Sequence, residues 1–206
     1  MEERKVSEAV IRRMPRYYRH LMFLRAQGVE RISSGKLADD MRLNASQVRQ
    51  DFNCFGEFGQ QGYGYNVESL LSEIRAILAL TKRYKLIIVG AGNIGQALAQ
   101  FEGFERDGFE VVALFDVDKS LIGTSVGGKP ILDAATMEDY IREQDVDIGV
   151  ITARRTVAQG IADRMNSAGI RGIWNFAPLD VESVVPVENV HMSDGLICLT
   201  YKIDKQ

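Results

Sequence analysis

Apolar side chains recur every three or four residues at the start of the chain, and this spacing predicts a helix from about Ser7 to Gln27. Pro15 falls inside the pattern, so it either kinks the helix or begins a new one. A second helical pattern precedes a domain boundary at residues 81–84. The apolar positions of the two patterns are Val10, Ile11, Met14, Tyr17, Tyr18, Leu21 and Leu24, and then Val67, Leu70, Leu71, Ile74, Ile77 and Leu78.

Two shorter helical segments lie between these patterns. Ser33 or Ser34 can cap a helix that extends through Met41. After a tight turn, Asn44 can cap a third helix over residues 45–52. We therefore expect a short helix, a turn and another helix in close succession.

The third of these helices combines an apolar side with an outward polar face. Val48 and Phe52 face inward, and Gln47 stands where a capping box needs it. This arrangement is typical of a helix-turn-helix, whose second helix enters the major groove of DNA. An ordinary three-helix bundle with a polar surface is the alternative. The outward residues, among which Arg can pair with guanine and Gln with adenine, are Ser46, Gln47, Arg49, Gln50 and Asn53.

Glycines alternate with aromatic residues over residues 55–67, which predicts a β-hairpin packed by Phe58, Tyr63 and Tyr65. A hairpin after a recognition helix is the wing of a winged helix, and a plain connecting hairpin is the alternative. The candidate DNA-binding residues of this half are Ser33, Ser34, Lys36, Asn44, Ser46, Gln47, Arg49, Gln50, Gln60, Gln61 and Tyr63.

From residue 85 onward, short apolar runs alternate with helical patterns. Strands are predicted at residues 85–89, 113–116, 129–131, 146–151 and 171–175, and helices at 136–143 and 156–168. This alternation predicts an α/β fold with a parallel sheet, of the Rossmann type.

The first of these strands runs into a Gly-x-Gly-x-x-Gly turn, and Asp116 follows 21 residues after its last glycine. Gly90 permits the tight turn, Gly92 lets the backbone approach a pyrophosphate, and Gly95 lets helix and strand pack closely. Asp116 is placed to bind a ribose diol and to repel a 2′-phosphate, so we expect NAD(H). The candidate residues of this part are Gly90, Ala91, Gly92, Asn93, Ile94, Gly95, Asp116 and Val117.

Ligands of parallel sheets lie beyond the carboxyl ends of the strands. Two segments occupy such ends and are candidates for the nicotinamide half of the site, although each could equally be an ordinary loop. Their residues are Thr152 and Ala153, and Asn175, Phe176, Ala177 and Pro178.

The net charge of −3 is unequally divided along the chain. Residues 1–84 carry a net charge of +4 and residues 85–206 a net charge of −7. A basic module joined to an acidic one indicates that the first meets a polyanion such as DNA, with a solvated basic face as the alternative.

The remaining composition argues against several function classes. No proton-transfer group stands in a recognisable dehydrogenase setting, which favours sensing over catalysis, so we do not expect an enzyme. Neither a metal-ligand spacing, a membrane span nor a signal peptide is found. The two cysteines form no disulfide framework and suggest a reducing cytoplasm. Residues 194–204 form an apolar helix that must cover something, such as a partner subunit.

Several motifs occur in a specific order: Tyr17-Tyr18-Arg19, Ser33-Ser34, Val48-Arg49-Gln50-Asp51-Phe52, Phe55-Gly56, Gly62-Tyr63-Gly64-Tyr65, Gly90-Ala91-Gly92-Asn93-Ile94-Gly95, Phe115-Asp116-Val117-Asp118, Ile122-Gly123, Gly169-Ile170 and Asn175-Phe176-Ala177-Pro178. Over nearly the whole chain, this order resembles that of the bacterial redox-sensing transcriptional repressor Rex family.

The resemblance implies a homodimer that binds A·T-rich palindromic operators and is released by NADH, a regulatory ligand. It implies a winged-helix domain at residues 1–82, a Rossmann domain at residues 83–191 and a swapped C-terminal helix at residues 192–206. In the family, the positions of Phe101, His191 and Met192 help to couple the nicotinamide pocket to Arg19 of the partner subunit.

Three rival interpretations stay open at this point. The chain could be an NAD-dependent oxidoreductase with a basic appendage, and NADH turnover with a small carbonyl substrate would reveal it. It could be a paralogue that binds DNA and nucleotide without coupling them. It could also bind coenzyme A or ADP on a related Rossmann core, against which Asp116 argues mildly.

Overall fold

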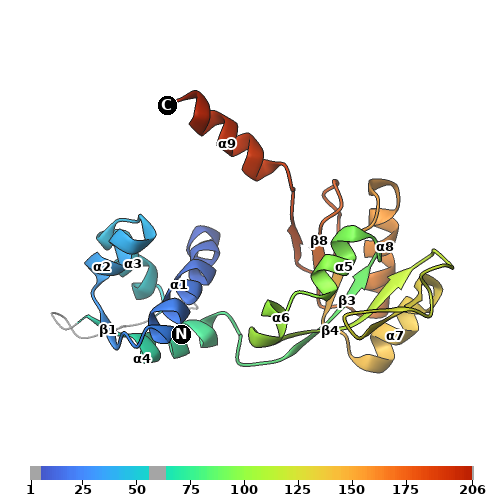
Figure 1. Cartoon of the computed structure of the whole chain (residues 1–206), viewed down its shortest axis with the longest axis horizontal. Helices are drawn as coiled ribbons and strands as arrows, with labels where there is room; N and C mark the ends of the chain where they lie inside the picture. Colours follow the sequence, from blue (N-terminus) through green and yellow to red (C-terminus); the bar gives the residue numbers. More distant parts are fainter. Residues whose placement is uncertain (1–5, 56–63, 206) are drawn as a thin grey trace. The chain divides into compact units, whose positions relative to one another are not determined.

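The computed structural model describes residues 6–55 and 64–205 of the 206-residue chain. The chain divides into two compact units, residues 1–82 and residues 83–206 (Figure 1). Each unit has its own hydrophobic core. Among the described residues, no helix is both long and apolar enough to cross a membrane.

The first unit consists of helices and a short antiparallel ladder. Three of its helices begin at a capping side chain, because Ser33, Asn44 and Asn66 each accept a hydrogen bond from the first helical turn. In chain order the elements are α1 (Glu8–Ala26), β1 (Arg31–Ile32), α2 (Ser34–Met41), α3 (Ala45–Asn53), β2 (Tyr65–Asn66) and α4 (Val67–Ile77). The predicted helices of this half are therefore confirmed.

Two local expectations for this unit need correction. Helix α1 continues through Pro15, so the option in which Pro15 begins a new helix is wrong. Pro15 lies on the exposed side of α1, where water can reach the carbonyl group that loses its helical partner. The capping box at Gln47 is also wrong, because its amide Nε2 donates to Asp51 Oδ1 at 2.8 Å instead of turning back to the helix start.

The predicted hairpin is only partly described. Residues Ile32 and Tyr65 are partners in the antiparallel ladder of β1 and β2. The Tyr65 ring is buried and meets the Phe52 ring edge-on, with 5.2 Å between centroids. Phe58, Gln60, Gln61 and Tyr63 lie outside the described residues. The hairpin as a whole, and its role as a wing, therefore stay predictions.

Within the described residues, the second unit is a seven-stranded sheet in the order β5-β6-β4-β3-β7-β8-β9. All neighbouring strands are parallel except β5 and β6, so the predicted parallel sheet is confirmed. Its elements are β3 (Tyr84–Val89), α5 (Asn93–Ala99), α6 (Gly103–Arg106), β4 (Phe109–Asp116), β5 (Ser125–Val126), β6 (Lys129–Asp133), the 3₁₀ turn η1 (Ala134–Thr136), α7 (Met137–Gln144), β7 (Ile148–Ile151), α8 (Arg155–Ala168), β8 (Gly172–Asn175), β9 (Val187–Asn189) and α9 (Asp194–Asp204).

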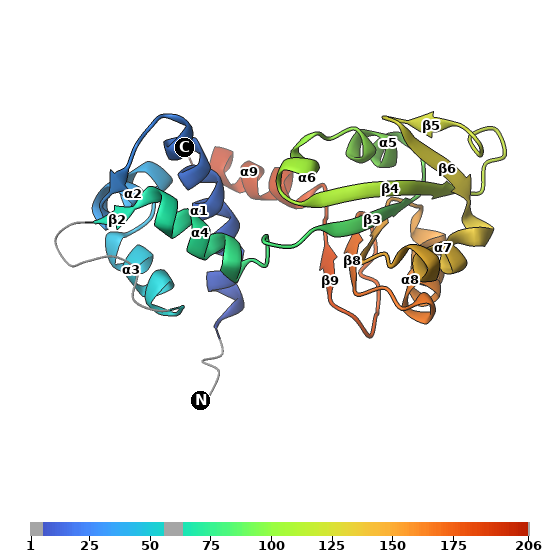
Figure 2. The same ribbon diagram turned by 90° about the horizontal axis from the view of Figure 1, so that it is seen from below.

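Helices cover both faces of this sheet (Figure 2). On one face, residues of α5 and α6 pack over Leu86, Ile88 and Leu114. On the other, α7 and α8 pack over Ile87 and Phe115. The central strands β3 and β7 are buried on both sides over most of their length, which explains why they are continuous apolar runs in the sequence.

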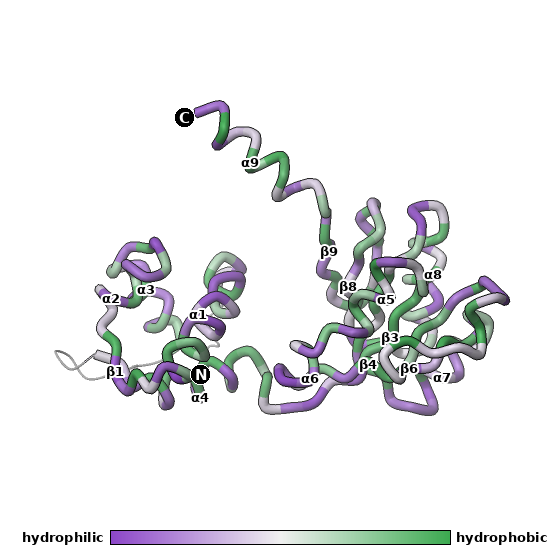
Figure 3. Tube along the Cα trace, in the orientation of Figure 1, coloured by the Kyte–Doolittle hydropathy of each residue, from purple (hydrophilic) through white to green (hydrophobic). Residues whose placement is uncertain are grey.

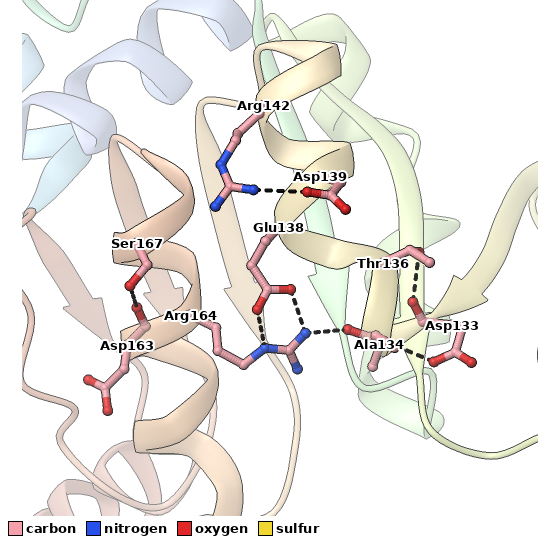
Figure 4. Close-up of polar contacts among 10 residues, drawn as sticks. Asp133, Ala134, Thr136, Glu138, Asp139, Arg142, Asp163, Arg164 and Ser167 are labelled. Carbon is pink, nitrogen blue, oxygen red and sulfur yellow. Dashed lines mark hydrogen bonds and ion pairs between the residues drawn. The ribbon is translucent and has the colours of Figure 1, made fainter.

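Helices α7 and α8 are joined by a two-pronged ion pair (Figure 4). The Arg164 guanidinium donates to both carboxylate oxygens of Glu138 at 2.5 Å and to the Ala134 carbonyl at 2.6 Å. The hydrogen bond from Arg164 lowers the pKa of the Glu138 carboxyl. This contact keeps the two helices of that face in register at the edge of the core.

Helix α9 has the bounds that the sequence predicts, and it differs from every other helix of its unit. All of its residues are exposed, including Leu196, Ile197 and Tyr201. Figure 3 shows hydrophobic and hydrophilic residues alternating along it. An apolar helix with no buried residue in one copy of the chain is the arrangement expected of an element that packs elsewhere.

Candidate functional site

The glycine turn lies at the carboxyl end of the central strand β3, between β4 and β7. The chain leaves β3 toward β4 and later returns to β7 on its other side, so this edge is the topological switch point of the sheet. At such a point the neighbouring loops diverge and leave a crevice for ligands. The site is therefore placed by the order of the strands.

The three glycines of the turn differ in what a Cβ atom would meet at each position. Gly90 has φ +109°, and a Cβ there would lie 2.9 Å from the carbonyl carbon of Thr152. A Cβ on Gly95 would lie 2.0 Å from the Gly90 carbonyl oxygen, so only glycine lets α5 begin this close to β3. A Cβ on Gly92 would meet nothing within 4 Å. The open space at Gly92 is where a ligand phosphate can approach the backbone.

Asp116 ends β4 and reaches across to the glycine turn. Its Oδ2 accepts a hydrogen bond from the Ala91 backbone N–H at 2.6 Å. Its Oδ1 accepts from the N–H groups of Val117 and Asp118 at 2.7 and 2.9 Å. A carboxylate offers about four acceptor positions, so one of them is left for a hydroxyl donor.

Two further side chains hold the turn from the other directions. The Thr152 hydroxyl, just after β7, donates to the Gly90 carbonyl at 2.7 Å. Gln96 Nε2 donates to the Ala91 carbonyl at 2.8 Å. The sequence reasoning missed Gln96, although its place in the first turn of α5 was visible. Asp116, Thr152 and the glycine turn are thus brought together, whereas Asn93 and Ile94 begin helix α5 beside them.

The second predicted strand-end segment has a structural core. Asn175 is fully buried, and its amide nitrogen donates to the Leu179 carbonyl and to Asn189 Oδ1 at 2.6 and 2.8 Å. Its Oδ1 accepts from the Ala177 N–H at 3.0 Å. Asn175 therefore shapes the loop and joins it to β9. Pro178 is exposed at the same carboxyl edge.

Aromatic rings connect this loop to the helices after the glycine turn. Phe176 and Trp174 have centroids 4.5 Å apart, and Trp174 contacts Phe104 at 5.9 Å. Phe104 in turn contacts Phe101 at 4.9 Å, and Phe101 is 57% exposed. The row of rings therefore runs from the predicted nicotinamide segment to the protein surface.

The segment between β9 and α9 contains His191 and the exposed Met192. The imidazole Nε2 of His191 lies 2.8 Å from Asp180 Oδ1. The sequence reasoning considered His191 only in relation to Arg19 and missed Asp180. Their spacing of 11 residues across a loop gives no sequence signal for this pair.

In the first unit, α2 and α3 present the predicted polar surface. Ser33 Oγ accepts from the Lys36 N–H at 3.0 Å, so Ser33 is the cap and Ser34 the first helical residue. Arg49 Nη1 donates to Ser34 Oγ at 3.2 Å, which joins the outward face of α3 to the start of α2.

The side chains of Asn44 and Gln47 form hydrogen bonds with residues of α3. Asn44 Oδ1 accepts from the Ser46 N–H at 2.9 Å and from the Ser46 hydroxyl at 2.5 Å. Gln47 bonds to Asp51 and is part-buried. Arg49 and Gln50 are exposed and remain the strongest candidates for reading base edges.

The position of α3 depends on a buried carboxylate that the sequence reasoning missed. Asp51 is fully buried and accepts two hydrogen bonds from the Arg13 guanidinium, both at 2.7 Å. The Tyr17 hydroxyl donates to it at 2.8 Å. Asp51 lies three residues after Val48, so helical spacing alone places it on the inward side.

The ionisation of Asp51 follows from these partners. Burial acts to raise the pKa of its carboxyl, but the hydrogen bonds from Arg13, Gln47 and Tyr17 outweigh that effect and the pKa is lowered. Burial, followed by the contact with Asp51, raises the pKa of Tyr17. A charged, fully bonded carboxylate thus fixes α3 on α1.

Comparisons with known proteins agree with this organisation. A family described as "Putative DNA-binding protein N-terminus" matches residues 5–53, and a CoA binding domain family matches residues 81–179. The redox-sensing transcriptional repressor Rex of Clostridium tetani is 47% identical over 207 residues, with 100% of this chain and 98% of that protein covered. The chain belongs to the Rex family.

Other Rex proteins are similarly related. Rex of Thermoanaerobacter pseudethanolicus is 48% identical over 204 residues, with 98% of this chain and 91% of the relative covered. Rex proteins are transcriptional repressors rather than enzymes, which agrees with the prediction of a non-enzyme.

Solved Rex structures have the same fold over nearly their whole length. The crystal structure of RSP in complex with beta-NAD+ and operator DNA has a TM-score of 0.93 and 47% identity, with 97% of this chain and 93% of that chain covered. RSP in complex with beta-NADH has a TM-score of 0.91 and 44% identity, with 98% and 95% covered. The Rossmann-type domain after a DNA-binding domain is thereby confirmed.

Proposed function

We propose that this protein is a repressor that binds operator DNA through its first unit and NAD(H) through its second, and that NADH releases it from DNA. The observation that best supports NAD(H) as the ligand is the hydrogen bond from the Ala91 N–H to Asp116. It places an acid beside the glycine turn at the topological switch point of the sheet. Solved relatives with operator DNA and with both forms of the dinucleotide support the proposal.

We assign the nucleotide to the glycine turn and Asp116. The pyrophosphate would lie at the start of α5, where a Cβ on Gly92 would meet only open space. Asp116 would bind the ribose diol and repel a 2′-phosphate, which favours NAD(H) over NADP(H). Ile94 and Val117, which are 40% and 81% exposed, would line the adenosine half. The Ala91 side chain is buried and its N–H bonds to Asp116, so Ala91 would shape the turn rather than touch the ligand.

The nicotinamide half would lie toward β7 and β8. Thr152 and Ala153 follow β7, and Phe176 follows β8 at the same edge of the sheet. Asn175 and Ala177 would hold that loop through their mutual hydrogen bond rather than touch the ligand. The rings that lead from Phe176 to Phe101 connect this region to an exposed surface.

DNA would meet the outward side of α3 and the start of α2. Arg49 and Gln50 would read base edges, and Ser34, Lys36 and Ser46 would contact phosphates. Asn44 and Gln47 would position the helix, as their hydrogen bonds to Ser46 and Asp51 indicate. Gln60, Gln61 and Tyr63 stay predictions from the sequence.

We infer that the working form is a homodimer in the cytoplasm, where a repressor reaches its operator. Helix α9 would pack its apolar side chains on the partner subunit, because they are all exposed in a single copy. Arg19, Phe101, His191 and Met192 are the candidate coupling residues of such a dimer. The ligand would release DNA only through its differential affinity for two arrangements of the dimer.

The first experiment is fluorescence anisotropy on a palindromic A·T-rich duplex, titrated in parallel with NADH, NAD+ and NADPH at fixed salt. Release by NADH alone is expected. Tight binding that ignores all three ligands would favour a repressor without redox coupling. Competition with coenzyme A and ADP addresses the remaining alternative, because the family that matches residues 81–179 is described as CoA binding.

A further inference from the structure

A chain of three charged or ionisable side chains connects α1 to the start of α2. Lys36 Nζ lies 2.5 Å from Asp40 Oδ1, one helical turn further along α2. The other carboxylate oxygen, Asp40 Oδ2, lies 3.3 Å from Nε2 of His20 on α1. One carboxylate therefore faces a lysine on one side and an imidazole on the other.

Lys36 is far more exposed to solvent than Asp40 and His20. Lys36 is 67% exposed, whereas Asp40 and His20 are 20% and 19% exposed. The Nε2 atom of His20 is buried and has no aligned hydrogen-bond partner within the described residues, although Asp40 is at ion-pair distance. Protonation of that atom would create a donor facing the carboxylate.

The restraint on Lys36 lies next to the proposed DNA-binding surface. Arg49 on the outward side of α3 donates to Ser34, the first residue of α2, and Lys36 follows two residues later. The first helix of a helix-turn-helix crosses the DNA backbone, so a lysine in its first turn is placed for a phosphate. A lysine paired with Asp40 is less available to that phosphate.

We propose that Asp40 is a positioning residue that withholds Lys36 from the DNA backbone, and that protonation of His20 relieves this restraint. The inference rests on the proposed DNA binding of the first unit. A protonated imidazole shares the negative charge of Asp40, so the carboxylate attracts Lys36 less. Histidine is the side chain that changes charge between about pH 5 and 8.

Further charged residues lie near this contact on the same two helices. Arg16 on α1 donates to the Met41 carbonyl at 3.2 Å, and Arg19 precedes His20 in the chain. Asp39 on α2 is exposed and also raises the pKa of Lys36, after the larger effects of Asp40. Asp39 therefore provides a matched control, because its loss changes the net charge equally without freeing Lys36.

The test compares Asp40→Asn with Asp39→Asn by anisotropy on an operator duplex and on a random duplex of equal length. Each freed lysine adds about 0.9 to the salt slope of log affinity, so Asp40→Asn should steepen the slope of a dimer by about 2. It should also tighten binding about tenfold near 0.1 M salt. Lys36→Met in the Asp40→Asn background should abolish both gains.

Equal gains in DNA affinity for Asp40→Asn and Asp39→Asn would overturn the proposal that Asp40 restrains Lys36. An unchanged DNA affinity in Asp40→Asn would overturn it as well. Because phosphate contacts ignore sequence, the gain should occur on both duplexes. A gain on both without operator preference would support the restraint while contradicting the proposed operator binding. Wild-type protein that binds neither duplex would overturn both.

The pH profile provides a readout that a purely structural role would not change. Wild-type and Asp39→Asn proteins should bind DNA more tightly at pH 6 than at pH 8. That difference should shrink in Asp40→Asn and in His20→Gln, while His191 is intact in all four proteins. An undiminished difference in His20→Gln would overturn the role of His20.

Discussion

Asp116 Oδ2 accepts a hydrogen bond from the Ala91 N–H at 2.6 Å, so the acid proposed to bind ribose also holds the glycine turn. The two residues lie 25 positions apart and come from the ends of neighbouring strands, β4 and β3. The spacing of a glycine motif and a later acid thus corresponds to a direct contact between them.

Asp116→Ala should weaken NADH binding by about 1–3 kcal/mol, the scale of a lost charge-assisted hydrogen bond. Calorimetry measures the change directly. Asp118→Ala is the matched control, because that carboxylate bonds to Ser120 and not to the glycine turn. Unchanged NADH affinity in Asp116→Ala would remove Asp116 from the site.

Gly92→Ala and Gly95→Ala should fail in different ways. The new methyl group at Gly95 would lie 2.0 Å from the Gly90 carbonyl, so the melting temperature should fall without ligand. The methyl group at Gly92 meets nothing within 4 Å, so stability should be kept while NADH affinity drops. Thermal unfolding and NADH titration of both variants separate the two effects. A Gly92→Ala protein with full NADH affinity would contradict the proposed pyrophosphate position.

Asp51→Asn should destabilise the first unit by about 3 kcal/mol, because it leaves the Arg13 guanidinium without its buried partner. Chemical denaturation measured at pH 7 tests this value. Asp139→Asn is a suitable comparison, since its ion pair with Arg142 is exposed and contributes little.

The same carboxylate predicts acid sensitivity of the first unit. The pKa of Asp51 is lower in the folded chain than in the unfolded chain, where it is about 3.9. Its contribution is therefore complete above about pH 4 and is lost as the pH falls toward the folded value. Asp51→Asn should show a smaller loss of unfolding free energy below pH 4, and an identical pH profile would contradict this assignment.

Arg49→Ala should cost about 1–3 kcal/mol in operator affinity and relax the preference at one base position. Anisotropy on operator duplexes with single base changes distinguishes this from a phosphate contact, which would weaken binding to every sequence equally. Arg12→Ala provides the control, because Arg12 pairs with Glu8 on the exposed side of α1.

Removal of residues 194–206 should convert the proposed dimer to a monomer, because the exposed apolar side chains of α9 would no longer bury surface on a partner. Light scattering of the truncated and full chains reports the change in mass. A truncated chain that remains dimeric would contradict a swapped C-terminal helix.

Much of the fold follows from local patterns in the sequence. Helix α9 begins and ends where its apolar residues predict, and Asn44 caps α3 as expected. The parallel sheet also follows, because apolar runs that alternate with helical patterns predict parallel strands. In these cases neighbouring residues carry the whole signal.

Apart from Gln96, whose partner Ala91 is near in the chain, most of the missed features depend on distant partners. The sequence shows Asp51 on an inward position, but only the packing of α1 on α3 brings Arg13 and Tyr17 to it. Strand β9 was not predicted because Val187–Asn189 is three residues long and has no alternating pattern. The sequence indicates Asn175 as a ligand candidate, because its bond to Asn189 depends on that unpredicted strand.

Three contacts hold the glycine turn before any ligand arrives: Asp116 at the end of β4, Thr152 just after β7 and Gln96 from α5. A loop already fixed in this way loses little conformational entropy when a dinucleotide docks, so binding can be tight without moving it. A glycine turn that does not move cannot itself report whether the bound dinucleotide is oxidised or reduced. The difference between oxidised and reduced nicotinamide must then be expressed as motion elsewhere, and residues 190–193, which connect the sheet to the fully exposed α9, are a candidate segment for that motion.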